Sequence, residues 1–121
     1  MAISYLGYEV FEDSDGTWSE TATLPAGTDC VVLVLAGYDP AAPDVSTISL
    51  GGTGMVFQTE DLETSFHSTH LYTQIATGTG AKTFACTMDS DWTVGGFAIL
   101  MYFSGVDQTT PVRDKVSEFC V

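Results

Sequence analysis

The sequence predicts an all-β protein: a single antiparallel β-sandwich, jelly-roll-like, with about eight strands. Short apolar or alternating segments recur roughly every dozen residues, and turn residues separate each pair of them. No amphipathic stretch at helical period is long enough to compete with these segments. We therefore expect one domain over residues 1–121, with residues 113–121 as a candidate extended tail.

Two apolar runs are the expected centre of the sandwich. They are CVVLVLA at residues 30–36 and FAILMYF at residues 97–103. Each is far shorter than the roughly 20 residues that a membrane-spanning helix needs. Glycines bound the second run, and both are rich in β-branched or aromatic side chains. They are therefore predicted to be strands buried on both faces.

The first third of the chain predicts two strands before the first apolar run. Residues 3–11 mix tyrosines with aliphatic side chains, and the EDSDG turn follows at residues 12–16. Residues 17–24 place Trp18, Ala22 and Leu24 on one phase, as in a half-buried strand. A turn at residues 25–28 then leads into the first apolar run.

The middle of the chain predicts a hairpin. Residues 46–50 and 55–59 both alternate, and GGTG lies between them as a tight connection. The preceding residues 37–44 contain two prolines and are expected to form a loop. The acidic residues 60–63 are expected to be loop as well.

Two more strands precede the second apolar run. Residues 66–76 place Leu71 and Ile75 on one phase and His70, Tyr72 and Gln74 on the other. Residues 82–88 have the cleanest alternation, with Phe84, Cys86 and Met88 pointing inward. The tail after residue 106 is compatible with an extended arm, a final strand or a short helical turn.

The charge excludes some partners. Sixteen acidic residues face three basic ones, so the formal net charge is −13. Such a chain lacks the cations that would neutralise nucleic-acid phosphates or anionic lipids, so neither nucleic acid nor a membrane is expected as a partner. The acidity either serves solubility alone or matches a basic partner surface or divalent cations. The three cysteines are odd in number, and Cys30 and Cys86 fit apolar strands as small core residues.

No cofactor is expected, and calcium is the weak candidate. Asp13 and Asp15 resemble the opening of a calcium loop, but Glu20 falls short of the position of the bidentate ligand. A turn in which Asp side chains bond the backbone explains the same residues equally well. His67 and His70 point to opposite faces of a strand, which argues against a joint metal site.

No catalytic signature is present, so an enzyme is not expected: the chain has no Gly-x-Ser-x-Gly elbow, and no carboxylate pair is singled out. Aromatic residues could form a platform for sugars, although core packing is the commoner role for such side chains. The candidates for this platform are Trp18, Trp92, Tyr38 and Tyr72.

Three segments resemble a small β-sandwich module of tailed-bacteriophage virion structural proteins, which also occurs in some bacterial surface proteins. They are LPAGT at residues 24–28, ISLGG at residues 48–52 and FSGVDQTTPV at residues 103–112. The last is the most specific. The resemblance implies a non-enzymatic structural or adhesive role and carries over no catalytic residue.

We therefore expect a capsid decoration (cement) protein that binds and stabilises the shell as a symmetric dimer or trimer. Its partner would be the major capsid protein or another virion protein. It would be made in the host cytoplasm, since no signal peptide is visible, and would reside in the virion. The expected contact residues are Tyr5, Tyr8, Tyr38, Arg113 and Phe119. The alternative is a carbohydrate-binding or adhesion module of a phage tail or bacterial surface appendage, which predicts exposed tryptophan or tyrosine.

Overall fold

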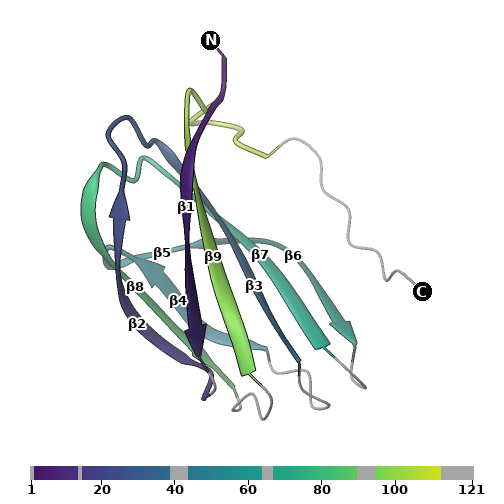
Figure 1. Cartoon of the computed structure of the whole chain (residues 1–121). Coiled ribbons are helices and arrows are strands. Elements are labelled where there is room, and N and C mark those ends of the chain that lie inside the picture. The colour runs from purple at the N-terminus through teal and green to yellow at the C-terminus, as the bar shows by residue number, and fades with distance from the viewer. Residues whose placement is uncertain (1, 14, 39–43, 64–66, 90–94, 113–121) are drawn as a thin grey trace.

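The computed structural model describes residues 2–13, 15–38, 44–63, 67–89 and 95–112, and these ranges contain nine strands in two sheets and no helix (Figure 1). In spatial order, the five-stranded sheet contains β1 (Ser4–Asp13), β9 (Gly95–Ser104), β3 (Cys30–Tyr38), β7 (His67–Ile75) and β6 (Val56–Glu63). The four-stranded sheet contains β2 (Thr17–Leu24), β8 (Gly80–Met88), β4 (Val45–Leu50) and β5 (Thr53–Gly54).

The chain alternates between the sheets in the way that makes a jelly roll. Strands β1, β3, β7 and β9 belong to one sheet, whereas β2, β4 and β8 belong to the other. All the strand pairs are antiparallel, and β9 lies between the first strand and β3. The predicted fold class, an all-β antiparallel sandwich, is confirmed. The described ranges hold no helix long and apolar enough to cross a membrane.

The core lies between the two sheets and is almost entirely hydrophobic. Phe84 of β8 is fully buried and stacks on Phe11 of β1, with ring centroids 6.3 Å apart. Trp18 is also buried and donates its indole N–H to the Phe11 carbonyl at 3.2 Å, which joins β2 to β1. The strand of residues 17–24 and the inward phase of residues 82–88 are confirmed, because Trp18, Ala22, Leu24, Phe84, Cys86 and Met88 are all buried.

The two apolar runs are buried on one face only, so the prediction that they are buried on both faces was wrong. In β3, Val31, Leu33 and Leu35 are fully buried, but Val32 and Val34 are half-buried. In β9, Ala98, Leu100 and Tyr102 face the core, whereas the side chains between them face outward. The physical reason is that, among the described residues, the four-stranded sheet is the one sheet that packs on this sheet, and it covers a single face.

The predicted hairpin and the predicted loop after it were also wrong in part. The turn at Gly51 and Gly52 is present, with φ values of 61° and 81°, but it pairs β4 only with the two residues of β5. The chain then crosses to the other sheet, where Val56–Glu63 forms one strand beside β7. The acidic residues 60–63, expected to be loop, form the second half of that strand. Cross-strand pairing with β7 overrides their low strand propensity.

Strand β7 turns its polar phase inward. His70 is fully buried, and Tyr72 and Gln74 are nearly so, while Leu71 and Ile75 face outward. The Gln74 side chain donates to the Leu50 carbonyl at 3.3 Å and thereby connects the sheets. Most buried polar groups have such a partner, although the Gln74 Oε1 atom has none among the described residues, so this strand contributes bonds as well as apolar contacts to the interior.

The segment after β9 is held by Asp29. The Asp29 carboxylate accepts the Gly105 and Val106 amides at 2.9 and 3.3 Å. The Gln108 side chain accepts the Ala76 amide at 2.7 Å and donates to the Asp29 carbonyl at 3.2 Å. The GVDQ segment therefore has a structural role, because it fastens the end of β9 to the end of β7.

Candidate functional site

The outer face of the five-stranded sheet is the most distinctive surface of the chain. Cross-strand register arranges its side chains in four rows, and we call this surface the apolar face. The rows are Tyr5, Phe103, Cys30 and Ile75; Tyr8, Met101, Val32, Thr73 and Val56; Val10, Ile99, Val34, Leu71 and Thr59; and Glu12, Phe97, Ala36, Thr69 and Asp61. The first three rows contain no charged residue, and the fourth has carboxylates only at its two ends.

Much of this surface is open to solvent. Tyr8 and Val56, at opposite edges of the second row, are 62% and 58% exposed. Tyr5 is 56% exposed and packs its ring on Phe103, with centroids 5.7 Å apart. In the part of the chain that the structure describes, no strand packs on this face. Contiguous exposed apolar surface on this scale is typical of an interaction site.

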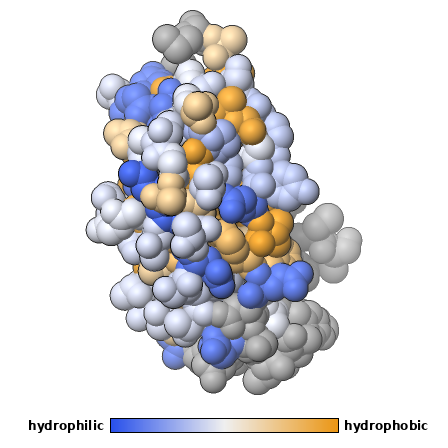
Figure 2. All heavy atoms as spheres, turned by 60° about the vertical axis from the view of Figure 1, so that its left-hand side comes forward, coloured by the Kyte–Doolittle hydropathy of each residue, from blue (hydrophilic) through white to orange (hydrophobic). Residues whose placement is uncertain are grey.

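The outer face of the four-stranded sheet differs chemically from the apolar face. Its outward positions are small and mostly hydroxyl-bearing: Thr17, Ser19, Thr21, Thr23, Thr47, Ser49, Ala81, Thr83, Ala85 and Thr87. Figure 2 brings this side of the molecule forward and shows a largely pale, weakly polar surface with separate apolar patches. The two outer faces therefore differ chemically, and only one is suited to hydrophobic association.

One corner of the apolar face is hollowed. A groove of about 310 Å³ lies where the segment after β9 passes over β6 and β7. It is lined by Val56, Gln58, Thr73 and Ile75 of the sheet and by residues 109–112. The FSGVDQTTPV segment thus forms one wall of a hollow on this surface.

The structure places two of the five predicted contact residues on the apolar face. These are Tyr5 and Tyr8, both on the edge strand β1. Tyr38 ends β3, and its side chain lies outside the described part. Arg113 and Phe119 also lie outside the described residues. The contact role of all five stays a prediction.

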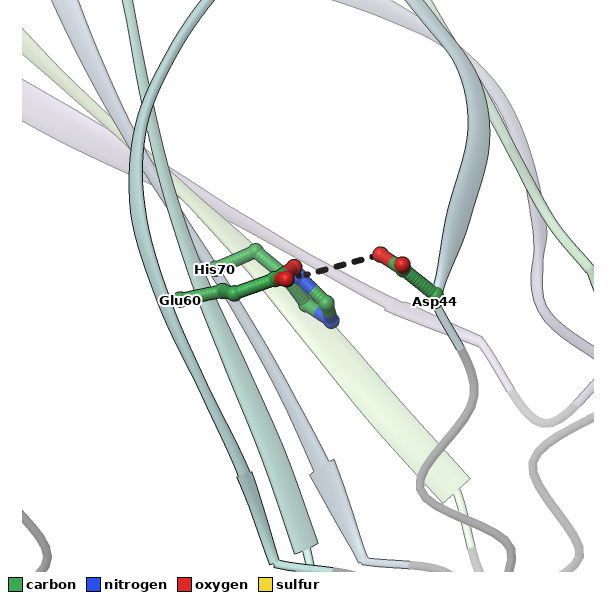
Figure 3. Close-up of side chains that lie close together, drawn as sticks. All are labelled: Asp44, Glu60 and His70. Atoms are coloured by element: carbon green, nitrogen blue, oxygen red, sulfur yellow. Dashed lines mark hydrogen bonds and ion pairs between the residues drawn. The ribbon is translucent and has the colours of Figure 1, made fainter.

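A cluster of three metal-ligating side chains lies at the other side of the same sheet. His70 of β7 and Glu60 of β6 point toward Asp44, which immediately precedes β4 (Figure 3). The His70 Nδ1 atom is 3.2 Å from a Glu60 oxygen and 3.7 Å from an Asp44 oxygen. The His70 side chain is fully buried, whereas those of Asp44 and Glu60 are 49% and 32% exposed.

The carboxylates of the cluster create a negative electrostatic potential around it. Burial raises the pKa of the Tyr72 hydroxyl above 10.0, and the charges of Asp44 and Glu60 raise it further. The Asp44 backbone is fixed by Asp89, whose carboxylate accepts the Asp44 amide at 3.0 Å and whose own amide donates to the Asp44 carbonyl at 2.8 Å. The Asp44 carboxylate itself accepts the Val45 amide at 2.7 Å, which orients it at the start of β4.

Sequence reasoning missed this cluster. It considered His70 as a metal ligand only together with His67, and it expected Glu60 and Asp44 to lie in two different loops. His70 is fully buried. The missing information was the register of β6 against β7, which places Glu60 opposite His70. A strand prediction for residues 56–63 would have supplied it.

The weak calcium candidate gains no support from its geometry. The Asp15 carboxylate accepts the Thr17 amide at 3.0 Å, as expected for an aspartate that caps a turn, and Gly16 has a φ of 77°. The side chain of Asp13 lies outside the described part. Calcium at this turn stays a prediction.

The described cysteines are not activated nucleophiles. Burial raises the pKa of Cys30 to about 11, with a further contribution from Asp29, and raises that of Cys86 to about 12. The thiolate is the reactive form of cysteine, so both side chains are inert at neutral pH. Cys86 packs in the core as the sequence predicts, whereas Cys30 is buried but lies on the outward phase of β3.

No protein-family model, curated protein or solved structure matches the chain. The resemblance to a phage virion module therefore stays a prediction. What the structure defines is a jelly-roll-like β-sandwich with one apolar outer face. Function is inferred from the geometry of that face.

Proposed function

We propose that this protein is a non-enzymatic structural protein that assembles through its apolar face. The single observation that carries the proposal is the outer surface of the five-stranded sheet, where three of four rows of side chains carry no charge in a chain of net charge −13. The more specific form of the proposal is a capsid decoration protein of a tailed phage, located in the virion. The resemblance of residues 24–28, 48–52 and 103–112 to a phage module supports that form.

The occupant of the apolar face is a second copy of the same chain. Five strands spaced by 4.8 Å and four rows spaced by two residues give a footprint of about 600 Å². Two such faces bury about 1,200 Å² in total, which is the lower limit of a specific stable interface. Two acidic chains can associate through this face, because the first three rows contain no carboxylate that would repel a carboxylate of the other copy.

Such a dimer would leave the hydroxyl-bearing face and the loops free to contact a shell. The major capsid protein, or another virion protein, is the proposed partner there. The mechanism is adhesive: each decoration unit contacts neighbouring shell subunits and raises the work needed to separate them. Binding energy in this class of interface comes from burial and complementary shape, and no bond is made or broken.

The carbohydrate-binding alternative has less support. Of the four aromatic residues of the predicted sugar platform, Trp18 and Tyr72 are buried in the core at 2% and 8% exposure. Trp92 and the side chain of Tyr38 lie outside the described part. A glycan array with a clear signal would favour this alternative over the assembly proposal.

Two experiments test the proposal at its two levels. Light scattering of the purified chain is expected to give twice the 12.9 kDa mass of one copy, and a monomer at all concentrations would refute assembly. Mass spectrometry of purified phage particles from the source is expected to find the protein in stoichiometric amounts. Its absence from particles would refute the virion role while leaving the dimer intact.

A further inference from the structure

The Asp44, Glu60 and His70 cluster lies outside the apolar face. All three offer one ligand atom within 4.8 Å of the others. They come from both sheets: His70 and Glu60 from the five-stranded sheet, and Asp44 from the start of β4 in the other. Any ion held by all three would therefore link the two layers of the sandwich.

The two carboxylates converge on the same nitrogen atom of a fully buried ring. The contact between Nδ1 and Glu60 is a hydrogen bond of 3.2 Å, and the Asp44 oxygen that lies 3.7 Å from Nδ1 also accepts the Val45 amide at 2.7 Å. A metal ion with bonds of about 2.0–2.2 Å and tetrahedral angles sets its ligands roughly 3.3–3.6 Å apart. The separations of 3.2 and 3.7 Å from Nδ1 to Glu60 and Asp44 lie just outside that range, and the ligand atoms of Asp44 and Glu60 lie within 4.8 Å of each other, so a bound ion would draw the three side chains slightly together.

The cluster carries a negative charge that a bound cation would neutralise. With a neutral imidazole, the two carboxylates give it a charge of −2. Lys82 is the single basic residue within the described ranges, and its side chain lies beside Gly51 and Gly78 instead. A divalent cation bound between the two carboxylates would neutralise this charge.

We propose that Asp44, Glu60 and His70 bind a divalent first-row transition metal, with Zn²⁺ as the representative ion. One imidazole and two carboxylates suit zinc and its neighbours, whereas calcium prefers an all-oxygen shell. The partial exposure of both carboxylates gives the ion a route from solvent and leaves a fourth position for water. The pairing of Asp44 with Asp89 holds that ligand ready.

The expected consequence is a metal-dependent staple between the sheets. The ion binds the folded chain, because the unfolded chain does not bring the three ligands together, so binding raises stability by mass action. At a free Zn²⁺ concentration about 100 times the dissociation constant, the melting temperature should rise by roughly 10 °C for a domain of this size.

The test uses the full-length chain after treatment with EDTA and gel filtration. Zn²⁺ is titrated by calorimetry and, in parallel, its effect on the melting temperature is measured. Asp44→Asn and Glu60→Gln each remove one ligand charge at a partly exposed position, and each should weaken binding at least about 100-fold. Asp61→Asn is the matched control, because it removes the same charge from the opposite face of β6 and should leave Zn²⁺ binding unchanged.

His70 is fully buried, so His70→Gln also risks unfolding and is interpreted only if its circular dichroism is native. Co²⁺ provides an independent readout, since a site with one nitrogen and two carboxylate ligands should give d–d absorption that Zn²⁺ displaces. Either of two outcomes would overturn the proposal: no uptake of Zn²⁺, Co²⁺, Mn²⁺ or Ni²⁺, or uptake that Asp44→Asn and Glu60→Gln do not affect. In the first case the cluster is held by the hydrogen bond between His70 and Glu60 and by the contact of His70 with Asp44.

Discussion

A lysine placed on the apolar face should dissociate the proposed dimer without unfolding the chain. Tyr8 is the best position, because it lies in the charge-free second row on the edge strand β1 and is 62% exposed. Its side chain makes few core contacts, so Tyr8→Lys should change the melting temperature by no more than about 2 °C. Thr21→Lys adds the same charge to the outer face of the other sheet and serves as the control.

The magnitude follows from the area that Tyr8 still exposes. A tyrosine that becomes fully buried covers 150–250 Å², so 62% exposure leaves about 120 Å² for a partner to cover. At about 25 cal/mol per Å², this area contributes about 3 kcal/mol per copy. Losing it from even one copy weakens the dimer about 100-fold, and burying an ammonium adds to the loss.

Sedimentation velocity over a range of concentrations measures the dimer dissociation constant for the native chain, Tyr8→Lys and Thr21→Lys. The expected result is an increase of about 100-fold or more for Tyr8→Lys alone. Equal constants for the two lysine variants would refute the assignment of the interface to this face. Unfolding of Tyr8→Lys, checked by circular dichroism, would instead direct the test to Val56→Lys at the opposite edge.

Three further predictions concern the fold. Phe84→Ala should lower the free energy of unfolding by about 3–5 kcal/mol in urea, because the ring is fully buried in the core; a loss below about 1 kcal/mol would contradict that packing. Gly105→Ala should cost at least about 1 kcal/mol more than Gly27→Ala, since both have positive φ but only at Gly105 would a Cβ collide with the Ala2 carbonyl. Cys86 should stabilise the fold fully below pH 9 and lose that contribution toward pH 12, because its pKa rises from 9.0 to about 12 and only the unfolded chain ionises in between; urea midpoints that stay constant over that window would contradict this.

The elements of the fold could be predicted from patterning because a half-buried strand has a period of two. Residues 17–24 and 82–88 show that period clearly, and both pack as expected. Burial was harder to predict for the apolar runs at 30–36 and 97–103. A continuous apolar sequence looks the same whether the chain itself covers the second face of the strand or leaves that face exposed. The error about their outer face is therefore informative, because that face is the one that we propose as the assembly surface.

The candidate metal site could not be predicted, because its ligands are brought together by register. Glu60 meets His70 only through the pairing of β6 with β7, and that pairing contains an irregularity between Phe57 and Thr59. A shift of one residue reverses the face that each later side chain occupies. Asp44 completes the cluster from the segment before β4 of the other sheet. It lies too far from Glu60 and His70 in the sequence for a local pattern to connect them.

The most direct test of the central claim is oxidative footprinting of Met101, in the middle of the apolar face. Met101 is half-buried in a single copy, so a second copy seated on the face should shield it from hydroxyl radicals. We predict that Met101 is oxidised several-fold more slowly in the native chain than in Tyr8→Lys, while the buried Met55 reacts equally slowly in both. Equal rates at Met101 in the two proteins would contradict the claim that this face is the assembly surface.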